Sequence, residues 1–155
     1  MTLEVWDSKL VDAGERLAAL RADLVARLGP IVSLAYSDVA GEPHDVTLRY
    51  ESTWRAEGLR SALAGARNDE LRRGLTLVGP HRDDLGITLS SLPSRTHASQ
   101  GEQRSLALAL RLASHRLIHD VTGAPPVLLL DDVFSELDPD RSAALLLSLP
   151  IGQAL

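Results

Sequence analysis

The segment from Val127 to Asp138 constrains the fold more than any other, because it joins an apolar run to paired acids. Val127 to Leu130 show no alternation with polar residues, a pattern typical of a parallel-sheet strand that is covered on both faces. Asp131 and Asp132 follow directly. Ligands of open α/β sheets bind at the carboxyl edge of the strands, so paired acids there suit Mg²⁺ and phosphoryl chemistry. The same residues also fit a plain strand end that leads into a helix cap.

Composition narrows the class of protein. The 155 residues are 45% hydrophobic and 24% charged, which is typical of one globular domain rather than of a disordered chain. Cysteine is absent, so disulfide scaffolds and thiolate metal sites are excluded. No apolar run is long enough for a membrane span, and no signal-peptide pattern is present. We therefore expect a cytoplasmic protein without a membrane partner, and the net charge of −5 gives no global reason to expect nucleic acid.

The first part of the chain is expected to be helical. Apolar residues alternate at spacings of three and four, which gives the helix one apolar face. These residues are Leu3, Trp6, Leu10, Ala13, Leu17, Leu20 and Leu24. Such a face fits either half of a coiled-coil arm or a helix lying on a core. Gly29-Pro30 is expected to stop or kink this helix before a shorter one, Ile31 to Val39.

The middle of the chain mixes strands and helices. Alternating residues predict a strand from Val46 to Tyr50, and apolar spacing predicts a helix from about Arg55 to Arg73, with Gly74 as its C-terminal cap. Short strands are expected at Leu75 to Val78 and at Leu85 to Leu89. The loop between them, residues 79–84 (GPHRDD), contains His81, Asp83 and Asp84. These three fit either metal ligands or a salt-bridged turn.

A second informative segment opens a long helix, predicted from Glu102 to about Val121. Its start contains Ser99, Gln100, Gly101 and Glu102. A hydroxyl, a glycine and the exposed N–H groups of a helix terminus together suit phosphate binding. The other interpretation is a capping box between Ser99 and Glu102. Basic residues on another face of this helix, namely Arg104, Arg111, His115 and His119, are expected to be solvated or to face another domain.

The segment after the paired acids is expected to turn into a last helix. Asp138 fits its N-cap and Pro139 its first position, and the helix is expected to cover Asp140 to Leu149.

Three motifs occur in a fixed order: SQGEQRSLALALRLA, VLLLDD and SELD. They resemble the signature motif, Walker B and D-loop of ATP-binding-cassette ATPases of the SMC type. Together with GPHRDD, they make the chain similar to the C-terminal portion of the RecF family, a resemblance that covers nearly the whole chain. It implies an α/β fold: the C-terminal lobe of an ABC/SMC-type P-loop ATPase head with a helical arm segment, incomplete as a fold. Residues 1–74 would form the arm segment with a short strand, and residues 75–155 the lobe.

The resemblance also implies roles for individual residues. Asp131 matches the Walker B acid that holds Mg²⁺, and Asp132 the carboxylate that positions the attacking water. Ser99, Gln100, Gly101 and Glu102 match the signature that contacts ATP on the other subunit of a head-to-head dimer. Asp138 matches the D-loop acid at the dimer interface. No chemical role follows for the four polar residues of GPHRDD, which are His81, Arg82, Asp83 and Asp84.

One ATPase motif is missing. The sole lysine, Lys9, lies in WDSKLVDAG, which lacks the glycines of a phosphate-binding Walker A loop. The glutamine-bearing loop and the strand with the switch residue are also not found. We therefore expect a fragment that does not hydrolyse ATP alone, although the family implies a slow DNA-dependent ATPase.

The function implied by the resemblance is recombinational DNA repair and replication restart during the SOS response to DNA damage. The implied partners are single-stranded or gapped double-stranded DNA, a second RecF-like head clamped by ATP, and RecO- and RecR-like proteins. Two alternatives to this function stay open. The first is a non-catalytic interaction module in which Asp131 and Asp132 are only structural. The second is a metal-dependent hydrolase that uses His81, Asp83 and Asp84.

Overall fold

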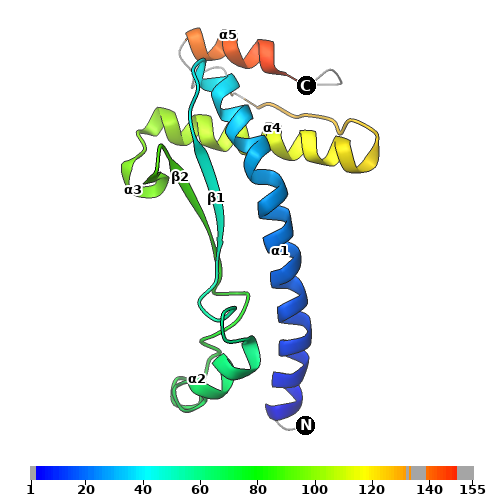
Figure 1. Cartoon of the computed structure of the whole chain (residues 1–155), viewed down its shortest axis with the longest axis vertical. Helices are drawn as coiled ribbons and strands as arrows, with labels where there is room; N and C mark the ends of the chain where they lie inside the picture. The colour runs from blue at the N-terminus through cyan, green and yellow to red at the C-terminus, as the bar shows by residue number, and fades with distance from the viewer. Residues whose placement is uncertain (1–2, 132, 134–138, 150–155) are drawn as a thin grey trace. The chain divides into compact units, whose positions relative to one another are not determined.

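The computed structural model describes residues 3–131, 133 and 139–149 (Figure 1). Helices dominate, and the strands form a three-stranded sheet in the order β1-β2-β3. The elements are α1 (Leu3–Ala40), β1 (Val46–Glu51), α2 (Leu59–Arg73), β2 (Asp84–Leu89), β3 (Leu92–Pro93), α3 (Ser94–His97), α4 (Gln100–Thr122) and α5 (Pro139–Ser148).

The chain divides into two compact units that interleave in sequence. Unit 1 comprises residues 1–25 and 49–86, and unit 2 comprises residues 26–48 and 87–155. The helix α1 and the strands β1 and β2 each contribute residues to both units. The division at residue 74 expected from the motifs stays a prediction.

Unit 1 has its own apolar core, formed where the first turns of α1 meet α2. Trp54 and Leu59 are the largest buried side chains there, at 2% and 0% exposure. The other buried members are Val11, Ala18, Ala62 and Leu63. Gly58, the N-cap residue of α2, has a φ of 86° and no side chain of its own to cap the helix. Instead, the carboxylate of Glu15 on α1 accepts a hydrogen bond from the Leu59 N–H at 3.1 Å, so the two helices are also joined by a polar contact.

Unit 2 has a larger core, built on the middle of α4. Leu106, Ala109 and Leu112 of α4 are buried against the last turns of α1. Val32, Ala35, Tyr36 and Val39 are the α1 members. The carboxyl-terminal part contributes Leu128 and, from α5, Leu145, and the strands contribute Val46 and Leu89. This core therefore places the start of α4, the segment before Asp131 and α5 in one compact unit.

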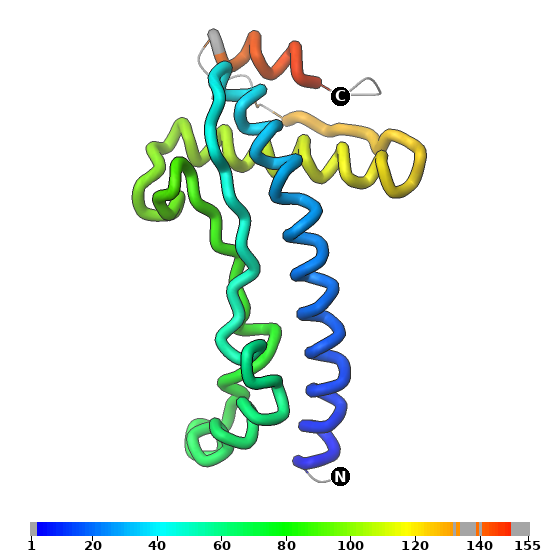
Figure 2. The backbone as a smooth tube through the Cα atoms, in the orientation of Figure 1, coloured from blue at the N-terminus to red at the C-terminus, as the bar shows by residue number. Residues whose placement is uncertain are grey.

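The helix α1 differs from the sequence prediction in length. It continues through Pro30 to Ala40, as its uninterrupted helical tube shows (Figure 2). Proline lacks the N–H that would bond one turn back, so the helix loses a hydrogen bond there. Four residues beyond Pro30 are fully buried in the core of unit 2, and we attribute the continuation to that burial; they are Val32, Ala35, Tyr36 and Val39.

The buried face of α1 also differs from the one expected for a helix lying on a core. Leu17, Leu20 and Leu24 are 41%, 61% and 48% exposed, whereas Ala18 is 1% exposed. Small residues of α1 allow Leu59 of α2 to approach the α1 backbone closely: a Cβ added at Gly14 would lie only 2.6 Å from Cδ2 of Leu59. Around Gly14 and Ala18 the helix therefore packs through small residues, and Leu17, Leu20 and Leu24 remain exposed in the described chain.

Two predicted strands are wrong. Residues 75–78 are irregular, because polar groups outside a sheet satisfy their backbone: Glu70 accepts from the Leu77 N–H, and the Thr76 carbonyl lies 3.1 Å from Nε2 of His81. Residues 127–130 contain only an isolated bridge at Leu128. Leu128 is 8% exposed while its neighbours Val127 and Leu129 are 55% and 72% exposed. This segment is thus covered on one face rather than on two.

Several other elements agree with the sequence patterns, whereas α2 begins at Leu59 instead of about Arg55, and β3 and α3 were not predicted. The strands β1 and β2 were expected within a residue of their observed bounds, and Gly74 ends α2 in the left-handed conformation. Ser90 and Ser91, with φ of 49° and 68°, form the tight turn between β2 and β3. Across that turn Leu89 pairs with Leu92 in an antiparallel register. Pro139 is the first residue of α5, as predicted, whereas Asp138 lies outside the described residues.

Candidate functional site

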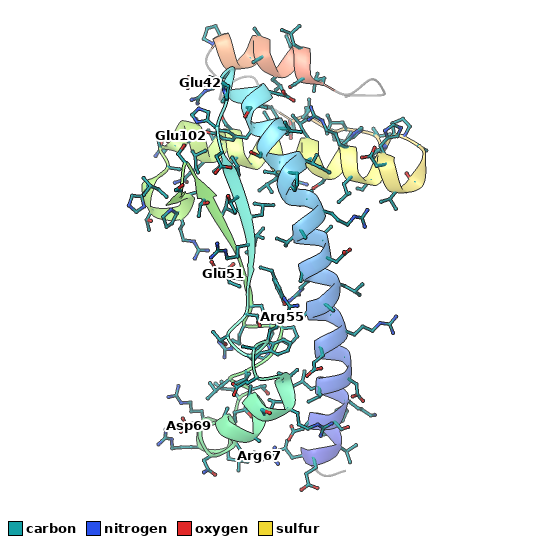
Figure 3. The ribbon with its side chains drawn as sticks, in the orientation of Figure 1. Glu42, Glu51, Arg55, Arg67, Asp69 and Glu102 are labelled. Carbon is teal, nitrogen blue, oxygen red and sulfur yellow. The ribbon has the colours of Figure 1, made fainter. Side chains whose placement is uncertain are left out.

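The candidate site is centred on the amino terminus of α4, where the predicted signature residues lie. Ser99 is the N-cap of the helix, with extended backbone (φ −62°, ψ 164°). Its hydroxyl accepts a hydrogen bond from the Glu102 N–H at 3.3 Å, and Oε2 of Glu102 accepts one from the Ser99 N–H at 2.7 Å. The predicted capping box is therefore confirmed. Figure 3 labels Glu102 at this end of α4.

The capping box leaves chemistry available to Ser99. A hydroxyl both donates and accepts, so a Ser99 Oγ that accepts from the Glu102 N–H still has its own proton to donate. Ser99 and Gln100 are exposed, and the positive end of the helix dipole lies beside them. The terminus thus retains the groups that suit an anionic ligand, while its own backbone is held in place by Glu102.

The electrostatics of this terminus favour a charged Glu102. Its hydrogen bonds with the side chain and backbone of Ser99 lower the pKa of Glu102, and the nearby positive charge of Arg141 adds to the effect. Burial raises the pKa of Tyr36, and the negative charge of Glu102 raises it further. Tyr36 is 1% exposed and meets the ring of His44 edge to face, with centroids 5.4 Å apart.

Gly101 is held closely by a residue from α5. A Cβ added at Gly101 would lie 2.6 Å from Nη1 of Arg141 and 3.7 Å from its Cζ. The guanidinium therefore lies against the first turn of α4. No sequence pattern identified Arg141 as a site residue. The available signal was its position directly after SELDPD, in the predicted last helix.

The predicted Walker B acids are described only in part. Asp131 is exposed and follows a segment whose Leu128 is buried in unit 2. Asp132 lies outside the described residues, as does Asp138. Within the described part of the chain, no group of three or more His, Cys, Asp or Glu residues is arranged to hold a metal ion.

His115 connects α4 to the segment that precedes Asp131. It was expected on a solvated face with Arg104, Arg111 and His119, but it is only 6% exposed. Its Nε2 lies 2.7 Å from the Pro126 carbonyl, whose oxygen can only accept, so Nε2 carries the proton. Nδ1 is buried and has no hydrogen-bond partner among the described residues. His115 therefore has a structural position rather than a surface one.

The GPHRDD loop is held by hydrogen bonds to residues far away in sequence, and its own sequence did not reveal these partners. Asp83 accepts hydrogen bonds from the Tyr50 hydroxyl and, at 2.8 Å, from Nε1 of Trp54. Nη1 of Arg21 donates to the Pro80 carbonyl at 2.6 Å. Both contacts lie within unit 1 and fix the loop against α1 and the end of β1. Because both oxygens of Asp83 already accept hydrogen bonds, the loop resembles a polar structural turn more than a metal site.

Comparisons with known proteins agree with this architecture. No protein-family model matches the chain. The chain is similar to the structure of the recombination mediator protein RecF with ATP in the RecFOR pathway, with a TM-score of 0.84 and 31% identity over 98% of this chain and 43% of that one. A second structure, of RecF with ATPrS, gives a TM-score of 0.83 and 32% identity. The fold is therefore that of part of an ABC/SMC-type ATPase.

Sequence relatives identify the family. The DNA replication and repair protein RecF of Geobacter sulfurreducens is 45% identical over 93% of this chain and 42% of its own length. RecF of Synechocystis sp. is 42% identical, and RecF of Streptomyces avermitilis 46%. The chain belongs to the RecF family. It spans less than half the length of these relatives, which fits the C-terminal portion expected from the motifs.

None of the described helices combines the length and apolar character needed to cross a membrane.

Proposed function

We propose that the chain is the lobe of a RecF-type ATPase head that supplies the signature motif, the Walker B acids and the D-loop. The observation that carries the proposal is the capped start of α4: an exposed serine hydroxyl and a glycine stand at a helix terminus whose first turn is held by Glu102. The same residues match the family signature, and similar proteins have been solved with ATP and with ATPrS.

The residues present fit a nucleotide. The helix terminus favours negative charge, and Ser99 has a hydroxyl proton to donate to a phosphate oxygen of ATP. Asp131, an exposed carboxylate, is the kind of oxygen ligand that Mg²⁺ prefers, and it would hold that ion with the ATP phosphates. When bound, Mg²⁺ supplies charge neutralisation on those phosphates. Asp132 would orient the attacking water and accept its proton, and Asp138 would contact the partner head.

In a complete protein, ATP would join two such heads into a homodimer, and hydrolysis would release them. That cycle would act on single-stranded or gapped DNA, with RecO- and RecR-like proteins, to load recombinase during repair and replication restart. The name of the pathway in the similar structures, RecFOR, and the repair and replication roles in the relatives' names support this part of the proposal.

The experiment uses a chimera: RecF of G. sulfurreducens with its matching segment replaced by this chain. Ser99→Asp separates the two roles of Ser99, because aspartate is as good an N-cap as serine but its carboxylate has no proton to donate. We expect the variant to keep its thermal stability and to lose ATP-dependent dimerisation, measured by sedimentation. A variant that dimerises with ATP as well as the unmodified chimera would refute phosphate binding by Ser99.

A further inference from the structure

The guanidinium of Arg141 gives α5 a direct contact with the signature motif. The guanidinium occupies the space beside the Gly101 Cα, since a Cβ added at Gly101 would lie 2.6 Å from Nη1 of Arg141. The same positive charge acts on two other groups: it adds to the lowering of the Glu102 pKa by the Ser99 hydrogen bonds, and it partly offsets the rise that burial causes in the pKa of Tyr36. Arg141, Glu102 and Tyr36 come from α5, α4 and α1, and all three lie within unit 2.

We propose that Arg141 is a positioning residue for the signature motif, and that Gly101 lacks a side chain partly to admit its guanidinium. The contact joins the helix that follows the predicted D-loop to the first turn of α4. Glu102 holds Ser99 through the capping box, so a cation beside Glu102 also stabilises the carboxylate that holds this N-cap. The orientation of the first turn of α4 then depends on α5. The consequence for ATP binding rests on the function proposed above, whereas the contact itself does not.

A double-mutant cycle in this chain tests the contact. Gly101→Ala alone should gain less stability than Gly65→Ala, because the guanidinium at the end of the flexible Arg141 side chain must move away from the new methyl group and give up its contact with the first turn of α4. In the Arg141→Ala background the same change should become more stabilising, because alanine is a better helix former than glycine. Urea unfolding of the four proteins measures the coupling.

Gly65 of α2 provides the matched control. A Cβ there would meet nothing within 4 Å, so Gly65→Ala reports helix propensity alone. It should lower the unfolding equilibrium constant about two- to fivefold, with or without Arg141. If Gly101→Ala behaves like Gly65→Ala in both backgrounds, Arg141 does not hold the signature and the proposal is wrong. Should this chain lack a cooperative transition, the same variants in the chimera give the answer.

A second readout separates positioning from packing. Arg141→Ala should raise the pKa of Glu102, followed by NMR of its carboxyl carbon, whereas Arg141→Lys should leave it lower than in the alanine variant. In the chimera, Arg141→Ala should weaken ATP-dependent dimerisation about tenfold, and Arg141→Lys should restore part of it. An unchanged Glu102 pKa together with unchanged dimerisation would overturn the positioning role.

The two proposals fail in different ways. If the unmodified chimera does not dimerise with ATP, the proposed function is wrong. The role of Arg141 in an ATP site is then also wrong, even if the double-mutant cycle shows coupling between Gly101 and Arg141. If the chimera dimerises with ATP and the cycle shows no coupling, the inference on Arg141 fails alone.

Discussion

At the scale of single residues, Asp83 is the acid whose loss should cost unit 1 most. It accepts hydrogen bonds from Tyr50 and from Trp54, and Trp54 is 2% exposed. Asp83→Ala leaves the buried indole N–H without a partner, so we expect a loss of about 2–3 kcal/mol in the free energy of unfolding. Asp84→Ala, at the exposed neighbouring position, should cost less than about 1 kcal/mol. Urea denaturation measures both, and equal losses would contradict the structural role of Asp83.

Glu102 should make stability depend on pH in the acidic range. Its pKa is lowered in the folded chain by its hydrogen bonds with Ser99. A lowered pKa means that its contribution is present above the unfolded value, near 4.5, and is lost as the pH falls through the folded value. Glu102→Gln should therefore be less stable than the unmodified chain at pH 7, with the difference shrinking towards pH 3. Urea midpoints across this range measure it, and a difference that is constant with pH would count against the interpretation.

At the scale of elements, the packing face of α1 gives a contrast between two neighbouring residues. Ala18 is 1% exposed and Leu20 is 61% exposed. Ala18→Leu should overfill the core of unit 1 and cost about 1–3 kcal/mol. Leu20→Gln should change the free energy of unfolding by less than about 0.5 kcal/mol. Thermal or urea unfolding would disprove the assignment of faces if the two effects were reversed.

Local sequence signals predicted elements well where the signal and the burial agree. The capping box of Ser99 and Glu102, the left-handed Gly74 and the strands β1 and β2 all follow from residues adjacent in sequence. The face of α1 could not be predicted in this way. Its leucines form the stronger apolar pattern, but the close approach of Leu59 to Gly14 selects the small residues instead.

The candidate site, too, could be predicted only where its residues are adjacent in sequence. Ser99 to Glu102 were predicted as a group because they are contiguous, and the structure places them in one helical turn. Arg141, His115 and the hydrogen bonds of Asp83 depend on contacts between residues far apart in sequence. His115 looked like part of a polar stripe, since nothing near it in sequence indicates that Pro126 accepts its hydrogen bond.

At the scale of the whole molecule, the exposed apolar residues of unit 2 predict limited solubility of this chain by itself. Leu147 is 90% exposed and Leu129 is 72% exposed. Large exposed apolar side chains favour association, so we expect the isolated chain to aggregate on heating and the chimera to be more stable. Light scattering during a thermal ramp measures this. A dilute, monomeric sample with a cooperative and reversible transition would contradict the expectation.

The most direct test of the ATPase assignment is the rate of ATP hydrolysis by the chimera with Asp132→Asn, compared with the unmodified chimera. Asp120→Asn, at an exposed position near the end of α4, is the matched control for removing one negative charge. We predict hydrolysis by the unmodified chimera and by the Asp120 variant, and a loss of about a hundredfold or more on Asp132→Asn. Hydrolysis that is unaffected by Asp132→Asn would contradict a catalytic role of Asp132 and favour a non-catalytic interaction module.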